Sequence, residues 1–227
     1  MASILVVDVG ASHVKVRATG EEEKRRTDSG PKMTGEQMVA AALELAEGWA
    51  WDCVTVGVPA VVKGGRVVAD PVNLGKGWEG FDYEAAFGKP TKVVNDAAMQ
   101  ALGSYDGGTM LFLGLGSGLG SALGVDGIIQ PMELGHLPYR DATFETYVGE
   151  AGLERHGKKH WRTHVADTVA RLSAALEPDY VVIGGGNVDK LKELPPNARP
   201  GDNENAFAGG FRLWDPAENV RIAGDAD

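Results

Sequence analysis

The chain has 227 residues, of which 43 % are hydrophobic and 24 % charged, and its formal net charge is −10. This composition is typical of a globular protein that can bury a sizeable core, as one large domain or as two small lobes. The acidic balance argues against a general nucleic-acid-binding or membrane-surface protein, so we expect neither kind of partner.

The single cysteine, Cys53, lies in an apolar run, which excludes an intrachain disulfide and a cysteine-rich metal site. The N-terminus enters a strand pattern directly, without the basic and apolar regions of a signal peptide, and no apolar run reaches membrane-spanning length. We therefore expect a cytoplasmic protein.

The first strand pattern, residues 3–8, is an apolar run that ends in Asp8, and residues 13–19 alternate like a strand returning beside it. A carboxylate at a strand end, next to a Gly/Ser turn, is well placed to hold Mg²⁺ through water while Gly10 and Ser12 approach a phosphate. A turn-capping aspartate is the alternative interpretation.

Four elements are expected in the next part of the chain: a charged turn over 21–26, a helix over 34–49 with Thr34 as its N-cap, a buried strand over 53–60 and a hairpin over 61–68. Residues 70–80 have no regular period and contain several breakers, which predicts a loop. Binding residues concentrate on such segments, and Asn73 is the candidate there.

Asn95 and Asp96 stand between a short strand pattern over 92–94 and a helix pattern over 97–102. Both residue types are good helix N-caps, which is the structural interpretation. A carboxylate at the C-terminal end of a strand in an α/β sheet is also where a catalytic base belongs. The sequence leaves both interpretations open.

Residues 111–123 (LFLGLGSGLGSAL) are two apolar runs joined by glycines and serines, which predicts two strands and a tight turn. Successive N–H groups in such a turn can form a concave anion site, to which Ser117 and Ser121 add hydroxyl donors. A plain hairpin is the alternative interpretation.

Glu133 and His136 follow a strand pattern and are separated by a flexible Leu-Gly, so both can face one pocket, although a lone histidine is usually structural. A helix over 143–154 carries Glu145. Residues 156–161 (HGKKHW) form a basic, aromatic patch, which a solvated helix end explains equally well, and a helix is expected over 162–176.

A buried strand pattern over 180–183 is followed by three glycines and Asn187, and then by a helical pattern over 189–194. A phosphate or nucleoside can approach the backbone closely at such a place, and a helix-entry turn is the alternative. A last short helix is expected over 207–214.

The order of these motifs resembles the ROK family of sugar kinases, within the actin/hexokinase/Hsp70 superfamily. The motifs are Asp8-x-Gly-x-Ser, Asn95-Asp96-Ala, Gly-Ser-Gly-Leu-Gly-Ser, Glu-x-Gly-His and Gly-Gly-Gly, and the resemblance covers about residues 4–211. Each motif is weak alone, but the ordered set is specific. The chain is most similar to polyphosphate glucokinases, which have counterparts of the loop at 70–78, of Glu-x-Gly-His and of the patch at 158–161.

The resemblance implies an α/β, two-lobed actin-like ATPase or ribonuclease H-like fold with an active-site cleft between the lobes. The small lobe would comprise residues 1–96 plus about 206–220, and the large lobe residues 97–205. It also implies a homodimer that transfers a phosphoryl group from polyphosphate and/or ATP, with Mg²⁺ held at Asp8 through water, to the 6-hydroxyl of glucose or a related hexose.

The matching positions imply a role for each candidate. Asp96 matches the catalytic base. The sugar-binding positions are matched by Asn95, Glu133, His136 and Glu145, with Asn73 as a further candidate. The phosphate-binding positions are matched by Asp8, Gly10, Ser12, Lys15, Gly116, Ser117, Gly118 and Gly120. The nucleotide segment is matched by Gly184, Gly185, Gly186 and Asn187. A polyphosphate track would run over Lys158, Lys159 and Arg162.

The chain departs from the family in its zinc motif and in its first phosphate segment, which reads Gly-Ala-Ser-His-Val-Lys instead of the glycine-richer usual form. The cysteine-rich zinc motif of many members is absent, so we expect no structural zinc and no zinc at His136. The overall surface is acidic, which suits a polyanionic donor poorly and keeps ATP open as the donor. The remaining alternatives are an ATP-dependent kinase for another hexose, a non-catalytic sugar-binding protein of the same family, and an actin-like filament-forming nucleotide switch.

Overall fold

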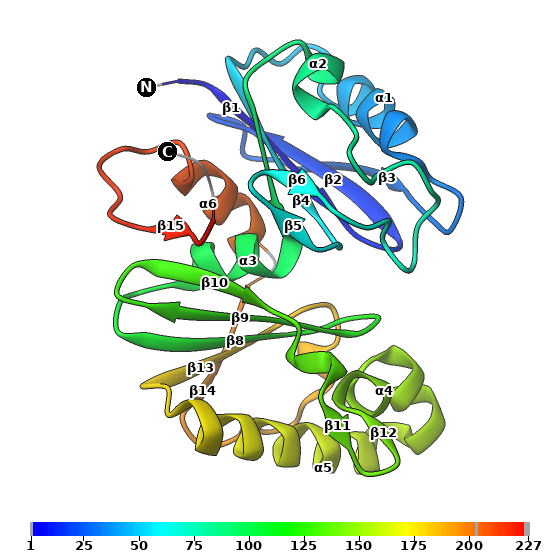
Figure 1. Cartoon of the computed structure of the whole chain (residues 1–227), viewed down its shortest axis with the longest axis vertical. Coiled ribbons are helices and arrows are strands. Elements are labelled where there is room, and N and C mark those ends of the chain that lie inside the picture. The colour runs from blue at the N-terminus through cyan, green and yellow to red at the C-terminus, as the bar shows by residue number, and fades with distance from the viewer. Residues whose placement is uncertain (1, 203, 225–227) are drawn as a thin grey trace.

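A computed structural model of the chain describes residues 2–202 and 204–224. Two sheets lie one above the other in Figure 1, with helices on their outer faces and two helices between them. No helix in these residues is long and apolar enough to cross a membrane.

The upper sheet in Figure 1 has the strand order β3-β2-β1-β4-β7. Its strands are β1 (Ile4–Val9), β2 (His13–Ala18), β3 (Arg25–Asp28), β4 (Cys53–Val58) and β7 (Thr91–Asn95). Strands β1, β4 and β7 are parallel, so their C-terminal ends lie at one edge. The unbroken apolar runs of β1 and β4 are buried along their whole length, as expected for central strands.

Two helices, α1 (Gly35–Leu45) and α2 (Tyr83–Phe87), pack on the outer face of this sheet. Thr34 is the N-cap of α1 and forms a capping box with Gln37, as the sequence predicted. The expected hairpin with Gly-Gly at its tip consists of β5 (Val62–Lys63) and β6 (Arg66–Val67).

The lower sheet has the strand order β14-β13-β8-β9-β10-β15. Its strands are β8 (Thr109–Leu115), β9 (Leu119–Val125), β10 (Ile128–Met132), β13 (Tyr180–Gly184), β14 (Ala198–Pro200) and β15 (Arg221–Ile222). The glycine-rich stretch is therefore the predicted hairpin, with β8 and β9 paired antiparallel. The long helix α5 (Glu150–Leu176) covers the outer face, beside α4 (Phe144–Val148) and a small hairpin of β11 (Pro138–Tyr139) and β12 (Ala142–Thr143).

Helices α3 (Asp96–Ser104) and α6 (Asn205–Arg212) lie between the two sheets and share one apolar core with both of them. The two helices approach so closely that a Cβ at Gly103 would lie 1.9 Å from the carbonyl oxygen of Asn205. Because α3 follows β7 without a loop, its first residue lies at the C-terminal edge of the upper sheet.

The structure differs from the sequence predictions at three helices and turns. The charged turn expected over 21–26 gives way to the edge strand β3. The helix expected over 143–154 is interrupted at Gly149, where a Cβ would lie 2.6 Å from the Ser117 carbonyl oxygen. Helix α5 begins at Glu150 and is itself kinked at Gly157, whose φ of 68° is not helical. The helix expected over 189–194 is only a 3₁₀ turn, Val188–Lys190.

Candidate active site

Two carboxylates meet at the C-terminal edge of the upper sheet. Asp8 is the penultimate residue of β1, and Asp96 is the first residue of α3. Strand β4 lies between β1 and β7, and a Cβ at its Gly57 would lie 2.3 Å from the Met99 Cε and 3.5 Å from the Asp96 Cα. The missing side chain of Gly57 therefore lets α3 approach the sheet, so that both carboxylates share one site.

The environment of the Asp96 carboxyl suits it to proton transfer. Burial raises the pKa of Asp96 to about 7, and the negative charges of Asp8 and Glu133 contribute to this rise. A hydrogen bond of 2.9 Å from the Ala97 N–H to Asp96 Oδ1 opposes it. A carboxyl whose pKa lies near neutrality can accept a hydroxyl proton efficiently at physiological pH.

Asn95, not Asp96, is the N-cap of α3. Its Oδ1 accepts a hydrogen bond from the Ala98 N–H at 3.0 Å, and its Nδ2 donates to the Ala60 carbonyl at 3.1 Å. The capping role therefore leaves the Asp96 carboxylate available for chemistry. The sugar contact of Asn95 stays a prediction, and it would use the remaining hydrogen-bonding capacity of this amide.

Asp8 is only 6 % exposed and forms an ion pair with Lys15, at 2.9 Å between Oδ2 and Nζ. The two residues are direct neighbours across β1 and β2. The turn between these strands is fixed by a hydrogen bond from the Gly10 N–H to the His13 carbonyl, whereas Ser12 is exposed. The predicted phosphate-binding residues of this segment thus surround the end of β1.

The donor set at Asp8 fits Mg²⁺. This ion is usually held by one or two carboxylates, with phosphate oxygens and waters completing its octahedron. Asp8, with Asp96 beside it, supplies carboxylate oxygens of that kind. Among residues 2–202 and 204–224, no group of three or more His, Cys, Asp or Glu side chains is arranged to hold a metal ion.

The turn of the glycine hairpin packs against the start of α3 on one side and against α4 on the other. A Cβ at Gly120 would lie 2.9 Å from the Ala97 Cβ, and one at Gly118 would lie 2.8 Å from Oε2 of Glu145. The carbonyl oxygens of Gly116 and Ser117 accept hydrogen bonds from the Glu150 N–H. In the described part of the chain the N–H groups of Ser117 and Gly118 have no partner, so they are available to an anion.

Ser121 has a structural role instead of the donor role expected for it. Its hydroxyl donates to the Met132 carbonyl at 2.8 Å and accepts from the Leu134 N–H at 3.1 Å, and the residue is buried. These bonds attach the chain around Glu133 to β9. The hairpin therefore positions the neighbouring Glu-x-Gly-His loop.

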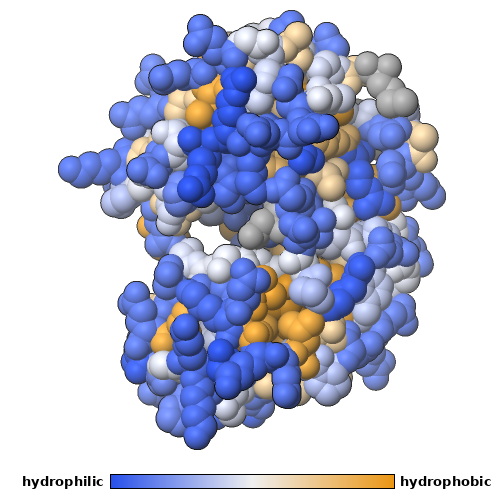
Figure 2. Space-filling model, turned by 180° about the vertical axis from the view of Figure 1, so that it is seen from behind, coloured by the Kyte–Doolittle hydropathy of each residue, from blue (hydrophilic) through white to orange (hydrophobic). Residues whose placement is uncertain are grey.

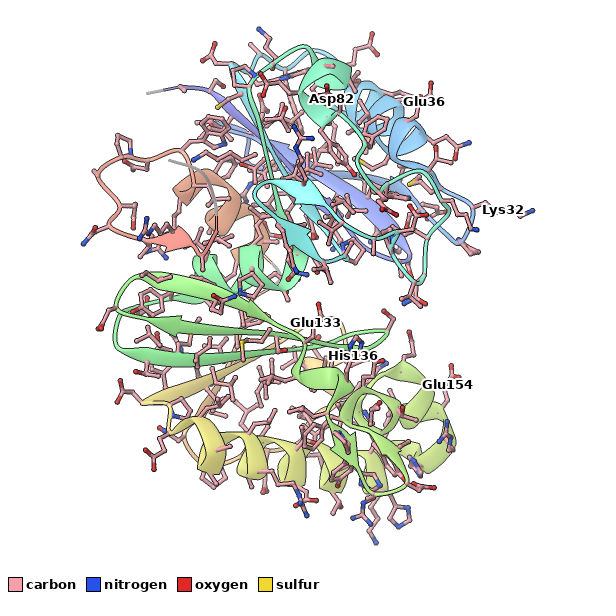
Figure 3. All side chains as sticks on the ribbon, viewed as in Figure 1. Lys32, Glu36, Asp82, Glu133, His136 and Glu154 are labelled. Atoms are coloured by element: carbon pink, nitrogen blue, oxygen red, sulfur yellow. The ribbon has the colours of Figure 1, made fainter. Side chains whose placement is uncertain are left out.

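His136 lies between two carboxylates. Its Nδ1 is 3.9 Å from Oε2 of Glu133, and its Nε2 is 3.6 Å from Oε1 of Glu145. Figure 3 shows Glu133 and His136 at the edge of the lower part that faces the upper part. Burial raises the pKa of Glu133 and the charge of Glu145 adds to this rise, while His136 opposes it. These three residues form a polar group that can bind the hydroxyls of a sugar.

The molecule is hollowed between its upper part, which contains the five-stranded sheet, and its lower part, which contains the six-stranded sheet. Figure 2 shows this hollow on the left of the space-filling view, which corresponds to the right of Figure 1. Asp8 belongs to the upper part, whereas Glu133 and the glycine turn belong to the lower part. Glu133 is close enough to Asp96 for its negative charge to contribute to the raised pKa of that carboxyl.

The Gly184–Asn187 segment packs against the glycine turn. The Asn187 side chain is buried, donates from Nδ2 to the Gly116 carbonyl at 3.2 Å, and accepts from Lys190 Nζ at 2.5 Å. Beyond it lies a cavity of about 300 Å³. It is lined by Val188, Asp189, Leu191, Lys192, Glu193, Leu194 and Pro200.

Four other candidates form no hydrogen bond or ion pair with the carboxylates or with His136 in the described residues. Asn73 is exposed on a loop of the upper part, while the neighbouring Trp78 is buried and donates from Nε1 to the Met33 carbonyl. Lys158 and Lys159 are exposed on α5. Arg162 donates from Nε to the Lys190 carbonyl at 2.6 Å and so lies near the Asn187 segment.

A cluster of aromatic and histidine side chains supports α4, and no pattern in the sequence predicts it. The Tyr139 hydroxyl donates to Asp167 at 2.8 Å and lies 3.2 Å from His164 Nδ1. Tyr147 is hydrogen-bonded to Asp141 and stacks on His156, with 5.1 Å between ring centroids. These contacts join the β11–β12 hairpin, α4 and α5, so they hold the helix that carries Glu145.

Comparison with solved structures places this fold among ROK family sugar kinases. A polyphosphate/ATP-glucomannokinase from Arthrobacter sp. is 25 % identical with a TM-score of 0.81, over 92 % of this chain and 97 % of the other. A ROK family glucokinase from Streptomyces griseus, bound to glucose and AMPPNP, is 18 % identical with a TM-score of 0.74, over 93 % and 98 %. A ROK hexokinase from Thermus thermophilus is 19 % identical with a TM-score of 0.67, over 92 % and 96 %.

No protein-family model and no curated protein matches the sequence. The three-dimensional comparison nevertheless confirms the resemblance to ROK family sugar kinases and the actin-like ATPase fold that the motifs predicted. The residue roles at the site stay predictions.

Proposed function

We propose that this protein is a hexose kinase that transfers a phosphoryl group from polyphosphate and/or ATP to the 6-hydroxyl of glucose, with Asp96 as the general base. The observation that carries the proposal is the environment of Asp96. Its pKa is raised to about 7 by burial and by the charges of Asp8 and Glu133. Asp96 also begins the helix against which the glycine turn packs. The likeness to the Arthrobacter glucomannokinase supports the same class of reaction.

In the proposed reaction, Glu133, His136 and Glu145 orient the hexose by directional hydrogen bonds. Asp96 accepts the proton of the attacking sugar hydroxyl. The oxygen of that hydroxyl forms a bond to the terminal phosphorus of the donor as the bond from this phosphorus to the leaving phosphate breaks. Such base catalysis contributes about 10²–10⁴-fold. The free N–H groups of Ser117 and Gly118 stabilise the charge of the transferred phosphoryl group.

Mg²⁺ bound at Asp8 would neutralise charge on the donor phosphates. Closure of the hollow between the two parts would exclude water, because hydrolysis of the donor is the competing reaction. For ATP, the cavity of about 300 Å³ beyond Asn187 would receive the nucleoside. A homodimer and a cytoplasmic location stay predictions.

The test is a coupled assay of glucose 6-phosphate formation with Mg²⁺, run in parallel with ATP and with polyphosphate, on the wild type and on Asp96→Asn. Glu36→Gln, which removes an exposed carboxylate of α1 far from the hollow, is the matched control (Figure 3). We expect Asp96→Asn to lose at least about 10²-fold in kcat while Glu36→Gln keeps the wild-type rate.

Turnover of Asp96→Asn within a few-fold of the wild type, with folding intact, contradicts the role of Asp96. Turnover with mannose or another hexose, but not with glucose, corrects the acceptor and keeps the mechanism. If a panel of hexoses fails with both donors, the protein is a sugar-binding member of the fold that has lost transfer, and the kinase proposal is wrong.

A further inference from the structure

One row of residues crosses the whole upper sheet on the face that packs against α3. Strand register places Val94, Gly57, Asp8, Lys15 and Arg26 opposite one another on β7, β4, β1, β2 and β3. Direct cross-strand neighbours lie on the same face of a sheet, with strands about 4.8 Å apart. The row therefore starts beside Asp96, which follows β7, and ends at β3, the outermost strand on the other side of the sheet.

The charge along this row changes from negative to positive toward the edge. Asp8 is paired with Lys15 at 2.9 Å, and Lys15 is opposite Arg26 in the antiparallel pair of β2 and β3. Arg26 is exposed and has no ion-pair partner in the described part of the chain. A guanidinium next to an ammonium, without a carboxylate of its own, is the arrangement expected of an anion-binding position.

A second pair of cations lies beside the row. Arg17 and Lys24 both contact the Glu204 carboxylate, with 2.9 Å between Arg17 Nη1 and Oε2. Glu204 is the N-cap of α6, and the Arg17 guanidinium lies 5.0 Å from the centroid of the Phe207 ring on this helix. This second pair is therefore neutralised by a carboxylate where the sheet meets α6, which leaves Lys15 and Arg26 as the cations of the row.

We propose that Lys15 and Arg26 bind the distal phosphates of a long linear polyanionic donor, inorganic polyphosphate, and lead it from the reacting centre over the β3 edge. The inference rests on the proposed kinase function. The terminal phosphate lies at Asp8 and Asp96, the following phosphates lie against Lys15, and the chain leaves past Arg26.

The path leaves across the strands and does not follow them. Residues 21–23 are three consecutive glutamates in the turn that joins β2 to β3, and they would repel a polyanion that continued along β2. An exit over the edge strand avoids these charges. In a chain with a net charge of −10, the arrangement gives a local positive route within an acidic surface.

The experiment compares Arg26→Gln and Arg26→Lys with Lys89→Gln. Lys89 is also an exposed cation, but it precedes β7 at the opposite end of the strands. Kinetics are measured with ATP, tripolyphosphate and long-chain polyphosphate at saturating glucose, and binding of labelled long-chain polyphosphate is measured separately at several salt concentrations.

We expect Arg26→Gln to raise KM for long-chain polyphosphate about five- to tenfold, the loss of roughly one charge contact, and to have a smaller effect on tripolyphosphate. The dependence of log Kd on log salt should become shallower by about 0.7–0.9. Arg26→Lys should restore affinity to within about twofold, because it keeps the positive charge that neutralises a phosphate. Lys89→Gln should leave both readouts at their wild-type values.

Equal KM and binding for Arg26→Gln and Lys89→Gln overturn the inference. So does loss of polyphosphate use in the double variant Lys158→Gln/Lys159→Gln, on α5, while Arg26→Gln keeps it. Wild-type turnover with ATP and no binding of polyphosphate also overturns the inference and leaves the kinase function standing. No phosphorylation with any donor overturns the kinase function, and binding lost only in Arg26→Gln then still supports the row as a polyanion site.

Discussion

The negative charge of Asp8, at the end of β1, acts directly on Asp96, at the start of α3, and helps raise its pKa to about 7. The two carboxylates come from different elements and have different partners. Asp8 forms an ion pair with Lys15 at 2.9 Å, whereas the pKa of Asp96 lies near neutral pH. This division fits one carboxylate for cation binding and the other for proton transfer.

The first prediction concerns the pH profile. A general base must be deprotonated, so kcat/KM should rise with pH and reach a plateau above about pH 7. Asp8→Asn removes a charge that raises the pKa of Asp96, so the rising limb should move to lower pH even though the rate falls. Both profiles are measured as kcat/KM for glucose from about pH 5 to about pH 9. A flat profile over this range contradicts the role of Asp96 as the base.

The second prediction is that Asp96→Asn stabilises the fold while it lowers kcat. Because the pKa of Asp96 is raised on folding, the native state binds more protons than the unfolded state between about pH 4 and pH 7. The free energy of unfolding therefore falls as pH rises through this range. Above about pH 7 the ionised Asp96 destabilises the wild type by at most about 4 kcal/mol.

Thermal unfolding at pH 5 and at pH 8 checks this sign. Asp96→Asn should have the higher Tm at pH 8, by about 2–4 °C for each kcal/mol, and the difference should shrink at pH 5. Glu36→Gln on α1 is the control for the loss of an exposed carboxylate. A lower Tm for Asp96→Asn at pH 8 would show that the raised pKa is not a property of the folded protein.

The third prediction uses two glycines of the same turn. A Cβ at Gly118 would lie 2.8 Å from Glu145 Oε2, whereas one at Gly116 meets no atom within 4 Å. Gly118→Ala should displace the Glu145 carboxylate and raise KM for the hexose several-fold. Gly116→Ala should instead occupy the open space above the turn and raise KM for the donor. Both KM values are measured for each variant, and the same pattern in both would contradict the assignment of separate sugar and phosphate sides.

Much of the fold was predictable because its core strands carry local signals. The apolar runs of β1, β4 and β13 and the glycines between β8 and β9 are visible in single stretches of the sequence. The chain order of weak motifs then indicated the fold, which the comparison with solved structures confirms.

Other features depend on residues far apart in the chain. Arg25–Asp28 is a strand because it pairs with β2, and its charged composition gives no sign of this. Gly149 breaks the predicted helix because Ser117, on another element, approaches it. The Asp8–Lys15–Arg26 row likewise requires the strand register, and the pKa of Asp96 requires the surroundings of its carboxyl.

The fourth prediction concerns metal and the cluster around Tyr139. The Tyr139 hydroxyl donates to Asp167 at 2.8 Å and contacts His164, and the Tyr139 ring stacks on Phe144 with 5.0 Å between centroids. These contacts form a side-chain network that joins the β11–β12 hairpin, α4 and α5. If a zinc ion stabilised this region, removal of the metal would destabilise the fold. A network of tyrosine, histidine and aspartate side chains does not depend on a metal.

A strong chelator should therefore leave the Tm of the protein unchanged within error, while Tyr139→Phe should lower it. Removal of the hydroxyl leaves the Asp167 and His164 side chains without this partner, at a cost of about 1–2 kcal/mol, or about 2–8 °C in Tm. Because α4 carries Glu145, KM for the hexose should rise in parallel. Tyr180→Phe, whose hydroxyl accepts a bond from the Asp106 N–H at the far side of the lower sheet, is the control for loss of a tyrosine hydroxyl. A fall in Tm with the chelator, measured without added Mg²⁺, together with an unchanged Tm for Tyr139→Phe, would contradict the structural role of this side-chain network.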